Sequence, residues 1–206
     1  MIPTVAACFQ LMDRYRMLDN IRDHSIIVAR ISALLAGGLA RTGLELSVPL
    51  TVAAALLHDI GKTACLDNDR DHADLGRDIC LEHGFAELAG VVGEHVHLRD
   101  NHLPVLTESE IVFYADKRVN HDRVVSLETR HEYILERYGN DDPARLAAIR
   151  SNCRKWWDIE VAFFAILPFT PAEVGGLIDV DPATCDFYLD VIPGVAGPAG
   201  GCCPEE

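Results

Sequence analysis

Apolar residues recur along most of the chain at intervals of three and four positions, which is the period of an amphipathic helix. No segment shows the strict alternation of a half-buried strand, and no internal repeat is detectable. The pattern predicts an all-α fold, a single helical bundle with additional C-terminal helices. The predicted helices begin near Pro3, Asn20, Ser47, Asp71, Phe85, Thr107, Ser126, Asp142 and Thr170.

Residues that favour helix ends sharpen several of these boundaries. Pro3 is expected in the first turn of its helix, and Asn20 is expected as the N-cap of the next one. Gly61 is expected as the C-cap of the third helix. Thr107 and Glu110 have the spacing of a capping box, in which each side chain binds the backbone N–H of the other residue.

Composition narrows the classes of partner. The 32 acidic and 18 basic residues give a net charge of -14, which repels a nucleic-acid backbone, so no nucleic-acid partner is expected. The 7 cysteines form no CxxC pair and indicate reduced thiols, with Cys202 and Cys203 as the candidates for reactivity. The longest apolar stretch identified, Val161–Leu167, is too short to cross a membrane, and the N-terminus lacks a signal-peptide pattern. We therefore expect a soluble, cytoplasmic protein without a membrane partner.

Several polar side chains occupy positions on the predicted apolar faces. His24, His72, His95 and Asp116 lie on four different predicted helices, and the pair His58-Asp59 ends a fifth, very apolar one. Taken alone, a histidine on an apolar face is more often a hydrogen-bonded core residue than a ligand, and a buried aspartate can pair with an arginine. Leaving such groups unpartnered costs on the order of 1–3 kcal/mol each, and one metal centre would satisfy them together.

The order of these residues resembles that of the HD-domain superfamily of metal-dependent phosphohydrolases. The resemblance covers about residues 21–123, roughly half of the chain, and four blocks in the same order make it more specific than a His-Asp dipeptide alone. The matching blocks are His24-Ser-Ile-Ile-Val-Ala29, Ala54-Ala-Leu-Leu-His-Asp-Ile-Gly-Lys62, His72-Ala-Asp-Leu-Gly76 and Tyr114-Ala-Asp-Lys-Arg118.

The resemblance implies one or two divalent cations held by protein side chains. It assigns a first site to His24, His58, Asp59 and Asp116, with Asp59 bridging to a second site completed by His72 and His95. His83 shares a predicted helix face with His72, and His97 is close to His95, so either can replace the ligand named. Nitrogen and oxygen donors accept several ions, and Fe, Mn, Zn, Co, Ni and Mg are not distinguished.

The implied activity is hydrolysis of a phosphoester or phosphoanhydride in a nucleotide or another small phosphorylated molecule, through a metal-activated hydroxide. Asp59, Lys62 and Arg118 are the expected catalytic residues, and Lys117 and Arg123 are weaker candidates for stabilising phosphoryl charge. Two other functions remain open, a di-iron oxygenase of the same superfamily and a non-catalytic module that senses a nucleotide.

The pattern also divides the chain by region. The HD domain is expected over residues 1–139, with accessory C-terminal helices packed on it over residues 140–192. Residues 193–206 are rich in glycine, proline and alanine and are expected to form a disordered tail.

Overall fold

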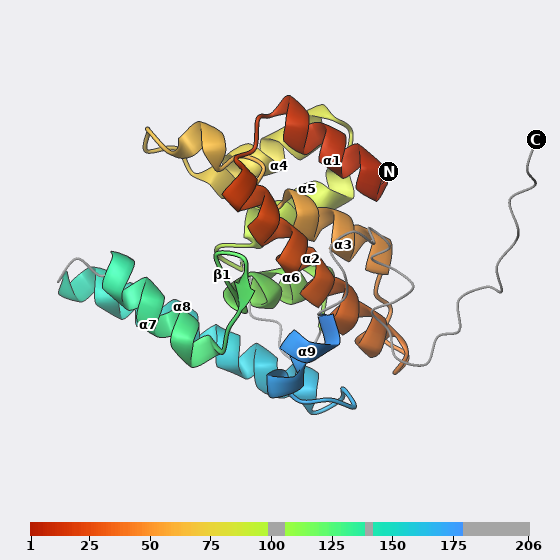
Figure 1. Cartoon of the computed structure of the whole chain (residues 1–206), viewed down its shortest axis with the longest axis vertical. Coiled ribbons are helices and arrows are strands. Elements are labelled where there is room, and N and C mark those ends of the chain that lie inside the picture. Colours follow the sequence, from red (N-terminus) through yellow and green to blue (C-terminus); the bar gives the residue numbers. More distant parts are fainter. Residues whose placement is uncertain (99–105, 139–141, 179–206) are drawn as a thin grey trace, which may run out of the picture.

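The computed structural model describes residues 1–98, 106–138 and 142–178. Helices dominate these residues, and the predicted all-α class is confirmed. The first part of the chain wraps α1 and α3–α6 around the long α2, which crosses the middle of the bundle (Figure 1). The helices of this part are α1 (Val5–Arg14), α2 (Asp19–Ala40), α3 (Val48–Leu57), α4 (His72–Glu82), α5 (Ala86–Glu94) and α6 (Glu108–Lys117), with a short 3-10 turn, η1 (Thr63–Cys65), before α4.

The second part begins with a small antiparallel hairpin that the sequence pattern did not predict. Its strands, β1 (Val119–Asn120) and β2 (Arg123–Val124), have two residues each, too few for alternation to be visible. The helices α7 and α8 then run side by side as an arm that extends from the bundle (Figure 1). The elements of this part are α7 (Leu127–Tyr138), α8 (Pro143–Phe164), the 3-10 turn η2 (Pro171–Glu173) and α9 (Val174–Ile178).

The core is continuous between the two parts. Phe163 of α8 and Val174 of α9 belong to the same cluster of buried side chains as Leu35 of α2 and Phe113 of α6. Burial of this apolar surface is the main term that holds the C-terminal helices on the bundle. The division at residues 139 and 140 stays a prediction, and the proposed tail over residues 193–206 lies outside the described residues.

Helix α2 is the buried axis of the fold. Among the described residues it is the one helix with the length and apolar composition to cross a membrane, and 78% of its most apolar window is buried inside the protein. Single polar residues such as Arg30 interrupt its apolar run, so the longest unbroken apolar stretch of the chain is Val161–Leu167 instead. Burial against neighbouring helices is what the central helix of a bundle requires.

Two predicted N-termini are wrong by one or two residues. Helix α1 begins after Pro3, because the side chain of Thr4 accepts a hydrogen bond from a backbone N–H of the first turn at 3.2 Å. Helix α2 begins before Asn20, and its N-cap Leu18 has no capping side chain. The backbone N–H of Leu18 instead donates to Thr63 Oγ1 at 3.2 Å, so a distant turn replaces the local cap.

Gly61 is not the C-cap of α3, which ends at Leu57. A Cβ atom at Gly61 would lie 2.6 Å from the carbonyl oxygen of His72 and 3.0 Å from the backbone nitrogen of Gly76. Glycine is therefore required here because α4 approaches the backbone closely. The predicted Thr107–Glu110 capping box at α6 is confirmed. Gly84 follows α4 with a left-handed backbone, φ +75°.

Candidate metal centre

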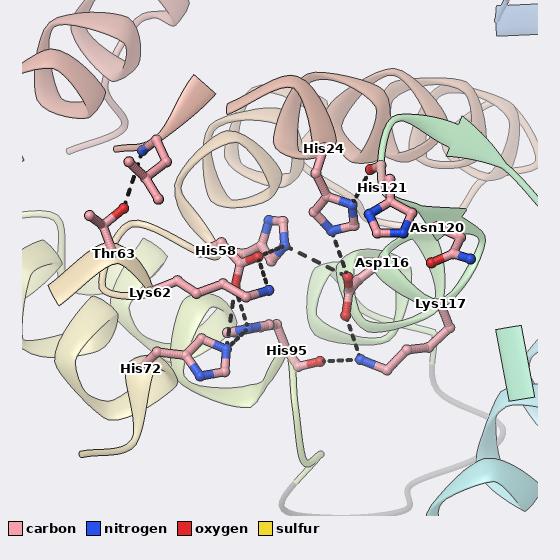
Figure 2. Close-up of polar contacts among 12 residues, drawn as sticks. His24, His58, Lys62, Thr63, His72, His95, Asp116, Lys117, Asn120 and His121 are labelled. Carbon is pink, nitrogen blue, oxygen red and sulfur yellow. Dashed lines mark hydrogen bonds and ion pairs between the residues drawn. The ribbon is translucent and has the colours of Figure 1, made fainter. Parts of the chain in front are cut away.

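The fold brings the predicted metal ligands together from five helices and the turn after α3. Figure 2 shows His24, His58, His72, His95 and Asp116 turned toward a common centre. His24 and Asp116 lie within α2 and α6, while His72 starts α4 and His95 caps the end of α5. His58 is the last residue before the turn that carries Asp59, so both side chains emerge from the core end of α3.

Asp59 lies between two groups of possible ligands. One group is His24, His58 and Asp59, the other is Asp59, His72 and His95, and the ligand atoms of each group lie within 4.8 Å of one another. Asp59 Oδ2 is 3.5 Å from His58 Nε2, while Asp59 Oδ1 is 3.3 Å from His72 Nε2 and 3.5 Å from His95 Nε2. The two carboxylate oxygens thus face different histidines, which is the arrangement of a bridging ligand.

Asp116 completes the first group. Its Oδ1 lies 2.9 Å from His24 Nε2 and 3.8 Å from His58 Nε2. The carboxylate therefore faces the same space as the two imidazoles, on the side away from His72 (Figure 2).

Backbone carbonyls fix the orientation of three of the four imidazoles. A carbonyl only accepts, so the Nδ1 atom of each ring is the donor and the opposite Nε2 of a neutral ring carries its lone pair toward the centre. The pairs are His24 Nδ1 with His121 O at 2.8 Å, His58 Nδ1 with Ala55 O at 2.7 Å, and His95 Nδ1 with Val92 O at 2.6 Å. Metal-binding histidines are usually held in this way.

The centre contains buried polar atoms that make no hydrogen bond within the described residues. His58 Nε2 and Asp59 Oδ1 make no hydrogen bond within the described part of the chain, although their side chains are at most 2% exposed. Each unpartnered atom of this kind costs about 1–3 kcal/mol. A divalent cation between these nitrogen and oxygen donors would satisfy both, and the donor set suits first-row transition metals. The residues therefore fit a metal.

The pKa shifts of His95 and Asp59 agree with cation binding, whereas burial acts to lower the pKa of His58 but Asp59 and Asp116 outweigh it and raise this pKa. Burial lowers the pKa of His95 to about 4, which keeps its imidazole neutral at pH 7. Burial acts to raise the pKa of Asp59, but His58 and Lys62 outweigh it and hold this pKa well below its ordinary value. A neutral imidazole and an ionised carboxylate are the protonation states that ligate metals.

Two lysines lie against the carboxylates. Lys62 Nζ is 2.7 Å from Asp59 Oδ2, and Lys117 Nζ is 2.5 Å from Asp116 Oδ2. Burial acts to raise the pKa of Asp116, but Lys117 and then His24 outweigh it, and the pKa lies well below its ordinary value. Lys62 thus lies at the centre. Lys117, which was expected only as a weaker candidate, also contacts a carboxylate of the centre.

Arg118 is not brought to the centre. Its buried guanidinium donates to Tyr114 Oη at 2.6 Å, to Val125 O and Pro171 O at 2.8 Å each, and to Glu160 Oε2 at 3.3 Å. These contacts tie α6 to α8 and η2. Arg118 therefore holds the C-terminal helices on the bundle. The sequence had predicted that it would stabilise charge on the phosphoryl group.

The remaining sequence candidates also lie elsewhere. His83 Nε2 contacts Tyr15 Oη at 3.2 Å, and its ring stacks on Phe85, at the far end of α4 from His72. His97 and Arg123 are exposed to solvent. The ligand positions next to Asp59 are therefore occupied by His72 and His95.

A cavity of about 250 Å³ opens beside the centre. His24, Asp59 and Lys62 line it together with residues of the hairpin and of α7. Arg130 and Arg137 also line the cavity and were not predicted from the sequence. Their spacing of seven residues on one predicted helix was the available signal, because such residues share a face.

Comparison with known proteins gives a family match over the segment that holds all of these ligands. Residues 21–121 match the HD domain. Ribonuclease Y of Protochlamydia amoebophila is 29% identical over 126 residues, which are 61% of this chain and 23% of that protein. No solved structure matches the chain.

Other relatives have different names. An uncharacterized protein of Methanocaldococcus jannaschii is 25% identical over 61% of this chain and 82% of that protein. A tRNA (cytidine(56)-2'-O)-methyltransferase of Thermoplasma volcanium is 27% identical over 72% of this chain and 46% of that protein. The chain thus spans about a quarter of the length of the ribonuclease Y relative and less than half of the methyltransferase.

Proposed function

We propose that this chain, which belongs to the HD-domain superfamily through residues 21–121, hydrolyses a phosphoester or phosphoanhydride of a small phosphorylated molecule with the help of divalent cations. A nucleotide is the substrate class we favour. The observation that carries the proposal is the position of Asp59, whose two oxygens face two separate groups of histidines beside a cavity with a cationic lining.

The six side chains His24, His58, Asp59, His72, His95 and Asp116 would hold the cations. When bound, such ions acidify water and neutralise charge on phosphoryl oxygens. Lys62 lines the cavity next to Asp59, where its ammonium group can stabilise negative charge that develops on the phosphoryl group. The Asp59 carboxylate also lines the cavity, so it can orient an attacking water by accepting a hydrogen bond.

Two observations favour a small substrate over RNA, although relatives carry the name ribonuclease Y. The net charge of -14 opposes binding of a long polyanion. The cavity of about 250 Å³ is small among ligand pockets, so it suits a small phosphorylated molecule better than a long chain.

The completeness of the ligand set favours an enzyme over a sensing module. All six side chains are present, and five of them are buried. Burying His58 Nε2 and Asp59 Oδ1 without a hydrogen bond from the described residues costs free energy, and a module that only senses a ligand does not require this arrangement.

The test is a screen of the full chain for phosphate release after its metals are removed and replaced singly by Mn, Fe, Co, Ni, Zn or Mg. Substrates are nucleotides, cyclic dinucleotides, dinucleoside polyphosphates and a short RNA. We expect turnover of a small substrate that falls by about 1,000-fold or more in Asp59→Ala, because both cations lose a ligand. The matched control is Asp69→Ala, an exposed carboxylate whose loss should leave the rate unchanged.

Three results would contradict the proposal. Absence of hydrolysis with every metal would refute it, as would an Asp59→Ala variant that retains full activity. Iron-dependent oxygen consumption without phosphate release would instead identify the protein as an oxygenase of the same superfamily.

A further inference from the structure

We infer that α7 carries a second anion-binding subsite, so that the substrate has an additional anionic group besides the phosphoryl group that is cleaved. This inference rests on the proposed function and deepens it. Its residues are Arg130, Tyr133 and Arg137, which line the same cavity as His24 and Asp59. They lie after residue 121, outside the matched HD segment.

The three residues form one face of α7. Their spacing of three and four positions places their side chains in a row along the helix. The row lines the cavity, and the hairpin that precedes α7 supplies Asn120 and His121 to the same lining. Asn120 and His121 in turn lie beside His24 and Asp116 (Figure 2), so the hairpin connects the metal centre to α7.

Arg130 is held in place with donor capacity to spare. Its Nη1 donates to Asn120 Oδ1 at 3.1 Å, and its guanidinium carbon lies 5.6 Å from the centre of the Tyr133 ring. The Nε atom of Arg130 is buried and has no hydrogen-bond partner among the described residues. The His121 ring packs edge-on against the Tyr133 ring, with the two ring centres 5.6 Å apart. A guanidinium fixed in this way is prepared to bind an anion with two parallel hydrogen bonds.

The charge of the cavity exceeds what one phosphoryl group requires. Asp59 is the one carboxylate among the described lining residues, and Lys62 already pairs with it at 2.7 Å. Lys62 and the cations that the centre would hold can neutralise charge on the cleaved group. The guanidinium groups of Arg130 and Arg137 add positive charge from a different element, in a protein with a net charge of -14.

The ligand group that matches this excess of positive charge is a second phosphate, or another group with two anionic oxygens, on the same small molecule. A bisphosphorylated sugar or nucleotide has this form, whereas a simple phosphomonoester does not. Guanidinium groups on one helix face would then select substrates by their second anion rather than by a base or sugar.

The test measures binding of phosphonates, whose carbon–phosphorus bonds resist phosphoester hydrolysis. Calorimetry on the Mn-loaded full chain compares α,ω-alkanebisphosphonates of one to six carbons with the alkylphosphonate of equal length. We expect the best bisphosphonate to bind about 10- to 100-fold more tightly than its monophosphonate, and we expect Arg130→Gln to remove this advantage while binding the monophosphonate as before.

Matched variants separate the subsite from general charge and from folding. Arg14→Gln removes one exposed positive charge from α1 and should preserve the bisphosphonate advantage. Arg130→Lys keeps the positive charge but removes the paired N–H donors of the guanidinium group. We expect this variant to lose most of the bisphosphonate advantage with an unchanged circular dichroism spectrum. Arg137→Gln gives an independent reduction if Arg130→Gln is unstable.

Equal affinity of the wild type for the two phosphonates would overturn the inference, and so would equal losses in Arg130→Gln and Arg14→Gln. The outcome is separate from that of the proposed function, because binding is measured without turnover. A bisphosphonate advantage that depends on Arg130 in a protein without any phosphate release would support the subsite and refute the hydrolase.

Discussion

Replacing Gly61 by alanine should destabilise the fold and disturb the metal centre through the same contact. The added Cβ would lie 2.6 Å from the carbonyl oxygen of His72, whereas ordinary contact begins near 3.4 Å. The start of α4 must therefore retreat by about 0.8 Å, the gap between those two distances. Overpacking of this kind costs about 1–3 kcal/mol, which the lower unfolded-state entropy of alanine offsets by less than about 1 kcal/mol.

Gly90 provides the matched control. It lies within α5, and a Cβ there would have no neighbour within 4 Å. Gly90→Ala should therefore stabilise the protein by about 0.5–1 kcal/mol through helix propensity alone. Urea unfolding followed by circular dichroism should separate the two variants by about 0.5–4 kcal/mol, and each kcal/mol corresponds to about 2–4 °C in Tm for a chain of this size.

The same variants test the link to the centre. The retreat of α4 carries His72 away from Asp59, so Gly61→Ala should hold less metal than the wild type, and Gly90→Ala should hold as much. A Gly61→Ala protein as stable as Gly90→Ala would refute the close approach of α4. An unstable variant with full metal content would show that the start of α4 is not coupled to the ligands.

The remaining predictions concern metal, the C-terminal helices and the thiols. Adding a divalent cation at about 100 times its Kd to the metal-free protein should stabilise it by about 2.7 kcal/mol, a rise of roughly 5–11 °C in Tm by scanning calorimetry, and a chelator should reverse the rise. Arg118→Met should cost about 3–5 kcal/mol in urea unfolding, because it removes the ion pair with Glu160 and the hydrogen bonds that the buried guanidinium donates to Tyr114 Oη, Val125 O and Pro171 O, and a large fall in kcat with unchanged stability would contradict this. Burial raises the pKa of Cys8 and Cys80 to about 12, so alkylation mapped by mass spectrometry at pH 8 should label Cys65 and spare both. Because that raised pKa favours the protonated thiol, the stability contributed by Cys8 and Cys80 is present below pH 9 and is lost between about pH 9 and 12, and unfolding curves with no change over this range would contradict the burial of these thiols.

The periodicity of apolar residues was sufficient to predict the helices and to single out most of the candidate ligands. His24 and Asp116 interrupt apolar faces that otherwise repeat regularly, and such interruptions are visible without a structure. Both side chains lie at the centre, as the pattern predicts. The geometry also separates His72 from His83, which share a helix but lie at opposite ends of it.

The roles of neighbouring cations were not predictable. Lys117 and Arg118 are adjacent at the end of α6, and successive side chains of a helix point about 100° apart. One therefore reaches Asp116 while the other reaches Glu160. Which of the two faces the centre depends on the packing of α8, which no local pattern reports.

Features that depend on tertiary contact were missed for the same reason. Gly61 has the sequence signature of a helix cap, but the approach of α4 explains it. Arg130 and Arg137 resemble the solvated face of a surface helix, and only the position of α7 beside the hairpin shows that they line a cavity. Functional residues outside a recognised motif were thus the least predictable part of the site.

The central claim, that Asp59 joins two cation sites, is tested most directly by counting bound metal in three proteins by inductively coupled plasma mass spectrometry. We expect about two ions per chain in the wild type, about one in His95→Ala and close to none in Asp59→Ala, because the first variant removes a ligand of one group and the second removes the ligand common to both. Equal metal content in the wild type and Asp59→Ala would contradict the account.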